Sequence, residues 1–340
     1  MVLLSANGPY LSELSASVRV VDLRVGRARY SIFPLARYIR KEKPDVLISS
    51  LLNIPAILAR ALSVTHAPII LTERSLFSSI SQTASSLTEK ISFAVSRYLY
   101  NRADRLVAVS RASADDLVRA GIVASEKVQV IYNPVVSSGL KTLMKVQPDH
   151  VWLKEKHKPV ILSVGRLAPE KNYDILLAAI SKIPEVRLII LGEGPERGML
   201  EQLSYSLGIF DRVSMPGFVQ NPFAFMARSD VFVLCSKYEG LPGALIQAMA
   251  CGVTPIATNS PGGIAEILGD ELRDNLVSTN DVVKLAEAIR KALTTPVERT
   301  KLIERAELFS EKASIDEYEV LVCDLLRKNS SVSYRNEGAC

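Results

Sequence analysis

The sequence has few of the residues from which metal centres and disulfide frameworks are built. It contains four cysteines and three histidines in 340 residues, and none of them has the close spacing of a zinc site or a redox pair. Cys235 and Cys251 lie inside apolar segments, so we expect both to be buried free thiols. These absences argue against a His/Cys metal site.

Long apolar runs are missing as well. The most apolar stretch, residues 46–71, is interrupted by Pro55, Arg60 and His66, whereas a membrane-spanning helix needs about 20 apolar residues. Residues 1–5 lack the basic stretch and the apolar run of a signal peptide. With 48% apolar and 23% charged residues, the composition is typical of a soluble globular protein. We therefore expect a cytoplasmic location.

Positive charge is concentrated in the first part of the chain. Residues 1–148 contain 19 Lys and Arg against 10 Asp and Glu, and the remainder contains 22 against 26. A basic half can serve an anionic membrane surface or an anionic lipid-linked acceptor, or it can be an ordinary solvated surface. The basic residues are not interleaved with aromatic ones, and no nucleic-acid motif is present, so no nucleic-acid partner is expected.

Short β-branched runs alternate with amphipathic stretches along most of the chain, which predicts parallel sheets with helical crossovers. The pattern is broken by a polar stretch near residues 135–158, so we expect an α/β protein with two doubly wound domains, and a frayed tail from residue 329. Predicted strands cover residues 18–23, 45–49, 69–72, 105–109, 128–131, 160–164, 187–191, 213–215 and 231–234. Predicted helices cover residues 32–41, 54–63, 87–100, 173–183, 196–207, 241–250 and 281–293.

Doubly wound domains bind ligands beyond the carboxyl ends of their strands, and the first candidate site follows the strand at 160–164. That strand ends in Gly165, and Arg166 and Lys171 come before the next helix. Two fixed cations beside a helix start favour binding of a diphosphate. The alternative is a surface loop with two solvated cations.

A second glycine turn, Gly192-Glu193-Gly194-Pro195, also follows a strand. Gly198 falls one place late for a dinucleotide fingerprint, which argues against a nicotinamide-dependent oxidoreductase. Because Pro195 fits the first turn of a helix, we interpret this segment as a turn and a weak signal.

The third candidate site is Glu239-Gly240-Leu241-Pro242-Gly243, between a strand and a helix. A carboxylate here can accept hydrogen bonds from sugar hydroxyls, while free amides at the helix start can meet a phosphate. The alternative is a carboxylate that only caps the helix. A sugar-nucleotide epimerase would explain this segment less well. Residues 260–266 form one more glycine turn before a helix.

In combination, these motifs resemble the C-terminal domain of family 4 glycosyltransferases, retaining enzymes of the GT-B fold. The resemblance rests on G-R-L…K at 165–171, G-x-G-P at 192–195, G-F at 217–218 and E-G-L-P at 239–242. The first half is similar through Ala103-Asp104, Val109-Ser110 and residues 131–134. The resemblance implies two Rossmann-like domains facing across a cleft. These would be an acceptor-side domain at 1–150 and a donor-nucleotide domain at 151–314, with a helix at about 315–328 that crosses back to the first domain.

The resemblance also implies the roles of individual residues. Arg166 and Lys171 would hold the donor diphosphate, and Glu239 the donor sugar; these three would be the catalytic residues. Phe218 and Val219 would contact the base, and UDP is the expected nucleotide, with GDP left open. No cofactor or metal is implied, because the two cations neutralise the departing diphosphate. The implied donor site comprises Gly165, Arg166, Lys171, Phe218, Val219, Glu239, Gly240, Leu241, Pro242, Gly243, Ala244 and Gln247.

The chain departs from the family pattern in three places. Gln247 stands where the family has a glutamate that meets the ribose hydroxyls, so donor affinity should be lower. Residues 1–5 align best with the family's second strand, so its opening strand and glycine-rich loop are expected to be absent, which leaves a central sheet position empty. Glu73 and Arg74 stand where the family often has a histidine near the acceptor; they are acceptor-side candidates or a surface ion pair.

The sequence therefore predicts a retaining glycosyltransferase, a hexosyl- or N-acetylhexosaminyltransferase of polysaccharide or lipopolysaccharide biosynthesis. It would move a sugar from a nucleotide-sugar, UDP by default, to a growing glycan or lipid-linked acceptor. It would be cytoplasmic, with a peripheral position at the inner face of the cell membrane also open. The alternative is a catalytically weak or inactive relative that still binds nucleotide.

Overall fold

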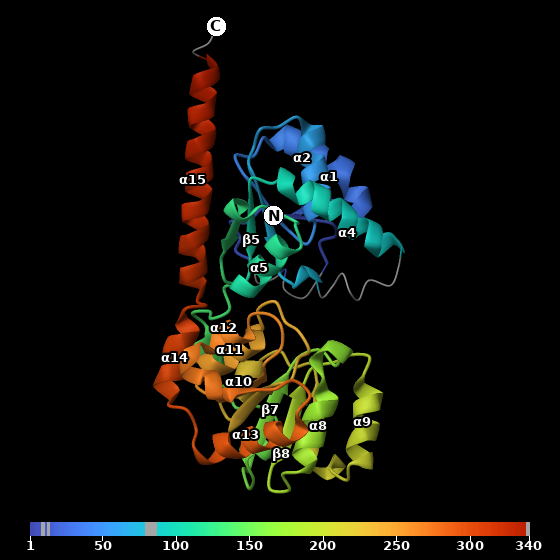
Figure 1. Ribbon diagram of the computed structural model, residues 1–340, viewed down its shortest axis with the longest axis vertical. Coiled ribbons are helices and arrows are strands. Elements are labelled where there is room, and N and C mark those ends of the chain that lie inside the picture. Colours follow the sequence, from blue (N-terminus) through green and yellow to red (C-terminus); the bar gives the residue numbers. More distant parts are fainter. Residues whose placement is uncertain (8–10, 12–13, 79–86, 338–340) are drawn as a thin grey trace. The chain divides into compact units, whose positions relative to one another are not determined.

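A computed structural model describes residues 1–7, 11, 14–78 and 87–337 of the chain (Figure 1). Contacts between residues divide it into two compact units. The first unit comprises Met1–Ala108, Ala114–Val130 and Tyr318–Cys340, and the second comprises Val109–Ser113 and Ile131–Glu317. The sequence analysis places the division near residue 150, whereas residues 131–150 pack with the second unit.

The second unit is built on a six-stranded sheet in which every adjacent pair is parallel. The strand order is β12-β11-β10-β7-β8-β9, which is a doubly wound arrangement. β7, β8 and β10 have the bounds predicted from the sequence, whereas β11 and β12 were not predicted. The strands are β7 (Val160–Val164), β8 (Arg187–Leu191), β9 (Val213–Gly217), β10 (Val231–Leu234), β11 (Thr254–Thr258) and β12 (Leu276–Val277).

Helices cover both faces of this sheet, because its strands are apolar on both sides. In β10, Phe232 and Leu234 pack into one core cluster, while Val231 and Val233 pack into the other. Continuous apolar runs of this kind are typical of parallel strands. Residues of α10, α11 and α14 join the first cluster, and those of α8, α9 and α13 join the second. The bounds are α8 (Tyr173–Ser181), α9 (Arg197–Ser206), α10 (Pro222–Met226), α11 (Gly243–Ala250), α12 (Ile264–Leu268), α13 (Val282–Thr294) and α14 (Arg299–Glu307).

The first unit contains a four-stranded parallel sheet, β3-β4-β5-β6, and a separate parallel pair, β1-β2. The strands predicted at 18–23 and 45–49 are not buried on both faces: Val18 and Val20 are each 38% exposed, and Ile48 is 53% exposed. β3 is an edge strand because no described residue pairs with its outer side. The bounds are β1 (Val2–Leu3), β2 (Val21–Asp22), β3 (Leu47–Ser50), β4 (Ile69–Glu73), β5 (Arg105–Ala108) and β6 (Val128–Val130).

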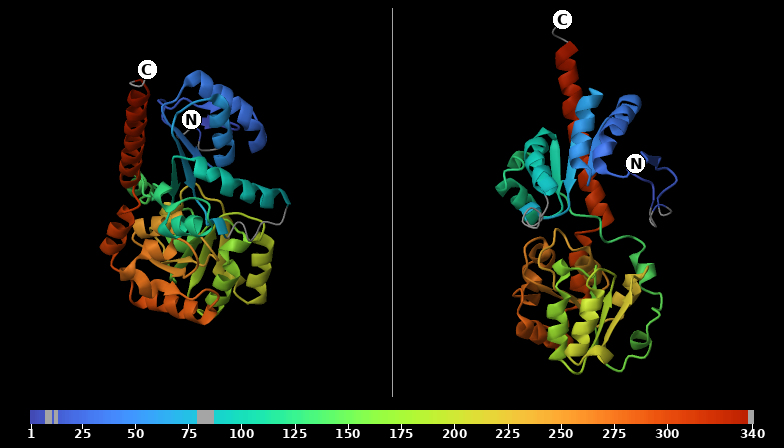
Figure 2. Two further views of the ribbon diagram at one scale, coloured as in Figure 1. Left: turned by 45° about the horizontal axis from the view of Figure 1, so that its top comes forward. Right: turned by 90° about the vertical axis from the view of Figure 1, so that its right-hand side faces the viewer.

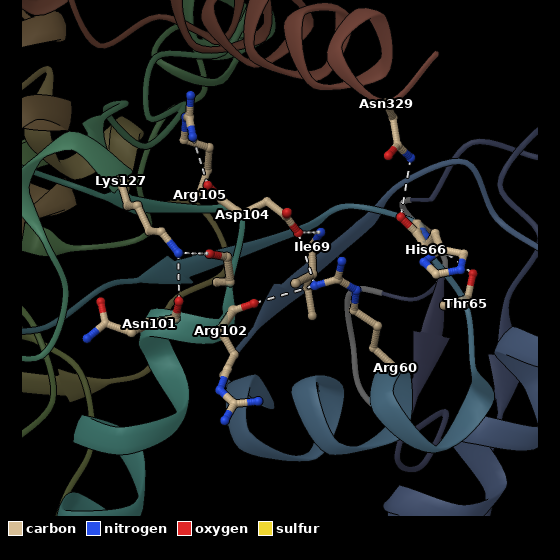
Figure 3. A network of polar contacts seen from close by, with 12 residues as sticks. Arg60, Thr65, His66, Ile69, Asn101, Arg102, Asp104, Arg105, Lys127 and Asn329 are labelled. Carbon is tan, nitrogen blue, oxygen red and sulfur yellow. Dashed lines mark hydrogen bonds and ion pairs between the residues drawn. The ribbon is translucent and has the colours of Figure 1, made fainter. Parts of the chain in front are cut away.

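Polar contacts at the start of β5 join several segments of the first unit (Figure 3). Asp104 Oδ2 accepts a hydrogen bond from the Ile69 amide at 2.8 Å and pairs with Arg60 at 3.0 Å. Lys127 donates to the carbonyls of Asn101 and Ala103 at 2.6 and 3.1 Å. The Ala103-Asp104 motif seen in the sequence therefore fastens β4, α2 and β5 together.

The helices of the first unit lie side by side, with α1 against α2 and α2 against α4. The last helix, α15 (Glu311–Glu337), begins in the second unit and continues in the first, and Figure 2 shows it as one unbroken helix. The tail expected to fray from residue 329 is thus helical as far as Glu337; Cys340 lies outside the described residues. The bounds are α1 (Ile32–Glu42), α2 (Asn53–Ser63), α4 (Leu87–Leu99) and α5 (Arg111–Arg119). Two short helices, α6 (Leu140–Leu143) and α7 (Val151–Lys154), belong to the second unit.

Two further sequence predictions can be compared with the described residues. Cys235 and Cys251 are buried free thiols, as expected, and burial raises the pKa of Cys251 to about 12. Among the helices described, none combines the length and the apolar character needed to cross a membrane.

Candidate functional site

The loop between β7 and α8 carries the two cations predicted to meet a diphosphate. Leu167 and Ala168 are buried and anchor this loop, and Asn172 turns the chain into α8 with a left-handed backbone, φ 57°. Arg166 and Lys171 are thereby held on either side of the anchor. They differ in environment, because the side chain of Arg166 is 67% exposed and that of Lys171 only 21%.

Lys171 forms an ion pair with Glu239, which follows β10, the neighbour of β7 in the sheet. Lys171 Nζ lies 2.5 Å from Glu239 Oε1, and the carboxylate is only 14% exposed. Ser236 donates a second hydrogen bond to the same oxygen at 2.7 Å. The structure therefore brings together two of the three predicted catalytic residues at the carboxyl edge of the sheet. Ser236 is a positioning residue to which the sequence analysis gave no role.

Arg166, the third predicted catalytic residue, pairs with Glu170 on its own loop, with NH2 and Oε1 2.5 Å apart. This contact holds the guanidinium in place at the surface. The backbone of Glu170 is also bonded to the loop that carries Glu239. The Lys237 amide on that loop donates a hydrogen bond to the Glu170 carbonyl at 2.8 Å. Both candidate loops are therefore fixed to each other through backbone as well as side chain.

Glycines allow these loops to approach one another. Gly192 has a φ of +137°, and a Cβ there would lie 2.0 Å from the Gly165 carbonyl oxygen. Gly262 has a φ of +121°, and its Cβ would lie 1.5 Å from the Glu239 carbonyl oxygen. No side chain fits either position. The glycine turns at residues 192–195 and 260–266 thus shape the loops that carry Arg166 and Glu239.

Next to Arg166 is a pocket of about 340 Å³. Phe218, which is 70% exposed, and Val219 line it. Glu193 lines it as well and is held by Arg197, whose NH2 lies 2.5 Å from Oε1. The sequence analysis interpreted Gly192-Glu193 only as a turn and so missed the contribution of Glu193 to the pocket. The pocket forms only when β8 and β9 pair. The lining residues are Val164, Gly165, Arg166, Leu191, Gly192, Glu193, Phe218, Val219 and Pro222.

The start of α11 contributes backbone rather than side chains. Leu241 is 8% exposed, so its side chain belongs to the core. The helix begins at Gly243 after Pro242, and no side chain caps it. The amides of its first turn, around Ala244, are therefore available to an anion. Gln247 lies half-buried one turn further along and does not line the pocket beside Phe218.

The acceptor-side candidates lie in the first unit and do not form an ion pair with each other among the described residues. Glu73 ends β4 and is partly buried, and this burial raises the pKa of its carboxyl. Tyr100 Oη donates to Glu73 Oε2 at 3.5 Å, and Asn53 Nδ2 donates to Tyr100 Oη at 3.3 Å. Arg74 is exposed. Glu73 is thus part of a buried polar group, whereas Arg74 faces solvent.

A further cluster centres on Glu266, which closes the fourth motif. Its carboxylate accepts hydrogen bonds from Tyr132 Oη at 2.6 Å and from the Arg111 amide at 2.8 Å. Burial and this carboxylate raise the pKa of Tyr132 to about 12. The sequence analysis included Glu266 only as the last residue of the glycine turn at 260–266. Its partners could not be recognised there, because they are more than 130 residues away in the chain.

Two family models match the chain. The model described as "Glycosyl transferases group 1" matches residues 148–309, and the model described as "Glycosyltransferase Family 4" matches residues 5–138. The chain therefore belongs to the family 4 type of glycosyltransferases with a GT-B fold, as its motifs indicate, and both of its halves are glycosyltransferase domains.

Relatives include two bacterial glycosyltransferases. One is the Campylobacter jejuni N-acetylgalactosamine-N,N'-diacetylbacillosaminyl-diphospho-undecaprenol 4-alpha-N-acetylgalactosaminyltransferase, which is 30% identical over 57% of this chain and 52% of that protein. The other is the Rhizobium meliloti lipopolysaccharide core biosynthesis glycosyltransferase LpsE, which is 32% identical over 47% of this chain and 48% of that protein. The chain spans about half the length of these relatives.

Solved structures share the fold at low sequence identity. Anabaena HepE in complex with UDP and glucose has a TM-score of 0.69 at 20% identity, over 93% of this chain and 86% of that one. The sucrose-phosphate synthase of Thermosynechococcus elongatus has a TM-score of 0.71 at 21% identity, over 99% and 88%. The predicted α/β fold of GT-B type is thus confirmed.

Proposed function

We propose that the protein transfers a sugar from a nucleotide-sugar to a growing glycan or lipid-linked acceptor, with retention of the anomeric configuration. The observation that carries this proposal is the ion pair between Lys171 and Glu239, supported by Ser236. It combines a cation suited to a diphosphate with a carboxylate suited to sugar hydroxyls at the sheet edge where doubly wound domains bind ligands.

In this proposal, Arg166 and Lys171 supply the charge that a metal ion supplies in other transferases. When the bond between the anomeric carbon and the diphosphate oxygen breaks, negative charge grows on the leaving group, and fixed cations stabilise it. The acceptor hydroxyl attacks the same face of the sugar, and the leaving phosphate oxygen takes its proton. Glu239 then binds sugar hydroxyls and performs no proton transfer, so no second carboxylate and no metal is required.

We further propose that the donor is a UDP-sugar. The exposed ring of Phe218 at the pocket beside Arg166 offers a surface on which a base can stack. HepE, which shares the fold, was solved with UDP and glucose, and this supports uridine as the nucleoside. Arg166 lines the same pocket, so a base there would have its diphosphate near the cation loop.

A lipid-linked acceptor is supported by the Campylobacter relative, whose name includes diphospho-undecaprenol. The first unit exposes apolar side chains, with Phe33 76% and Tyr30 56% exposed, close in the chain to Arg27 and Arg29. Aromatic rings beside cations suit an anionic membrane interface. We therefore propose that the protein works at the inner face of the cell membrane, with Glu73 and Arg74 on the acceptor side.

The alternative, a weak or inactive nucleotide-binding relative, is favoured by one observation. Gln247 provides a neutral amide on α11 where a carboxylate would hold ribose hydroxyls with charge assistance. This alternative retains nucleotide binding and loses transfer, so the two proposals predict different results with a complete donor.

The test is calorimetric titration with UDP, GDP and NAD in EDTA, followed by incubation with UDP-sugars. We expect UDP to bind without metal and Arg166→Ala to weaken it at least about tenfold. The control is Arg273→Ala, since Arg273 is exposed and does not line the donor pocket. Failure of every nucleotide to bind the folded protein would contradict the proposal. Binding of UDP without consumption of any UDP-sugar would favour the inactive relative.

A further inference from the structure

The second unit has a much larger cavity away from the donor pocket. Its volume is about 1090 Å³, and it shares no lining residue with the pocket beside Arg166. It is formed by the segment that follows β6, by α14, and by the start of α15. Pockets of about 300–1,000 Å³ are the size that holds small organic ligands, so this cavity can accept a molecule considerably larger than a phosphate ion.

The floor of the cavity is apolar. Leu140, Met144 and Ile303 line it from two different segments, and Leu140 belongs to the same buried cluster as the core of the second unit. No aromatic side chain is among the residues that line it. A nucleobase or a sugar ring would therefore find no stacking partner here, whereas an alkyl chain would find a continuous apolar surface.

The rim of the cavity is basic. Lys141, Lys145 and Lys312 line it, are exposed, and have no hydrogen bond or ion pair from their ammonium groups within the described part of the chain. Two lysines of one short segment and a third from α15 therefore line the same cavity. The lining also includes the cations Arg228 and Arg299 and the acids Glu307 and Glu311, so positive charge is in excess.

Exposed apolar side chains lie close to two of these lysines in the chain. Leu143 is 37% exposed and Val146 is 51% exposed, and they alternate in the chain with Lys141 and Lys145. Lysine side chains that surround exposed apolar groups are typical of surfaces that contact the headgroup region of a membrane, because the ammonium groups reach the phosphates while the apolar groups enter the lipid.

We infer that this cavity binds one molecule of an anionic phospholipid, with its phosphate among Lys141, Lys145 and Lys312 and its acyl region against Leu140, Met144 and Ile303. This inference goes beyond the proposed transferase activity, since it concerns a separate site that takes neither donor nor acceptor. Charge complementarity selects the anionic headgroup, and the apolar floor selects a lipid over a free phosphate.

The experiment titrates the full chain calorimetrically with a short-chain phosphatidylglycerol below its micelle concentration. Phosphatidylcholine of the same chain length and glycerol 3-phosphate are the comparison ligands. The double variant Lys141→Gln/Lys145→Gln removes charge from the rim. The matched control is Lys154→Gln/Lys301→Gln, because these lysines pair with Asp149 and Glu298 and do not line the cavity.

We expect phosphatidylglycerol to bind the wild type and the control equally, and Lys141→Gln/Lys145→Gln to bind it at least about tenfold more weakly. Thermal unfolding of each variant shows that it is folded without relying on nucleotide binding, which separates this result from any failure of the transferase proposal. Equal binding of phosphatidylcholine would overturn the role of charge. Equal binding of glycerol 3-phosphate would overturn the role of the apolar floor. No binding, or binding unchanged by the rim variant, would overturn the site itself.

Discussion

The ammonium group of Lys171 lies 2.5 Å from Oε1 of Glu239, although the two residues are 68 positions apart in the chain. They follow β7 and β10, which are adjacent strands of one parallel sheet. Both side chains are largely shielded from water. Under the proposed function, a diphosphate that reaches Lys171 would compete with Glu239 for the same cation, and the carboxylate would then be free to bind the sugar.

Removing only one member of this pair should cost stability, because a shielded charge is left without its partner. We expect Lys171→Met to lower the free energy of unfolding by about 1–3 kcal/mol. Lys171→Met/Glu239→Gln should recover part of that loss, yet both variants should lose UDP binding. Urea unfolding and calorimetry measure the two quantities separately. Recovery of nucleotide binding in the double variant would show that Lys171 has no role beyond balancing Glu239.

Gly262→Ala should disturb the Glu239 loop directly. A Cβ at this position would lie 1.5 Å from the Glu239 carbonyl oxygen, and the backbone φ of +121° is unfavourable for alanine. We expect a loss of about 2 kcal/mol or more in unfolding free energy, together with weaker UDP binding. Gly198→Ala is the matched control, since nothing lies within 4 Å of its Cβ and alanine favours a helix. An unfolding curve of Gly262→Ala equal to that of the wild type would contradict this contact.

Phe218→Ala should separate ligand binding from stability. The ring is 70% exposed, so its loss should change the unfolding free energy by less than about 0.5 kcal/mol. If the base stacks on it, UDP affinity should fall by roughly tenfold. Phe33→Ala removes an equally exposed ring from the first unit and should leave UDP affinity unchanged. The same affinity in both variants would exclude Phe218 as the stacking residue.

Gln247→Glu tests the proposed departure on α11. If the ribose hydroxyls reach this side chain, a carboxylate should bind them with charge assistance and tighten UDP binding by about three- to tenfold. Gln202→Glu introduces the same change on α9 at an exposed position outside the donor pocket. Weaker UDP binding by Gln247→Glu than by Gln202→Glu would mean that the carboxylate repels the diphosphate and that the ribose lies elsewhere.

The buried carboxyl of Glu73 should make stability depend on pH. Burial raises its pKa in the folded state, so the folded protein holds this proton more tightly than the unfolded chain does. The contribution is therefore complete below the ordinary carboxyl pKa and is lost as pH rises through the raised value. Relative to the wild type, Glu73→Gln should gain stability between about pH 5 and about pH 8. Thermal unfolding at the two pH values gives the comparison; a constant difference would contradict it.

The sequence predicted strands best where burial is complete on both faces. β7, β8 and β10 are runs of apolar residues, and their bounds follow from composition alone. β11 is equally buried but reads Thr-Pro-Ile-Ala-Thr, in which Pro255 and two threonines hide the pattern. It is an interior strand because it pairs with β10 on one side and with the edge strand β12 on the other, and neither pairing is visible in the local sequence.

Sequence analysis likewise found some residues of the candidate site and missed others. Arg166, Lys171 and Glu239 were found because glycines and charges gather where strands end. The support given by Ser236, and the contribution of Glu193 to the pocket, were missed because both depend on contacts between different loops. Motifs thus indicate which side chains are candidates to bind a ligand, whereas the groups that hold these side chains in place are recognised only in the folded chain.

The first unit is made from three separate segments of the chain, and the last of them arrives only with α15. Asn329 donates to the His66 carbonyl at 3.2 Å (Figure 3), and Leu321 and Leu325 of this helix are buried. The residues of the second unit are therefore synthesised between the earlier segments of the first unit and α15. During translation those earlier segments would wait for α15 while the second unit is made, and that interval is when a chaperone would be most useful.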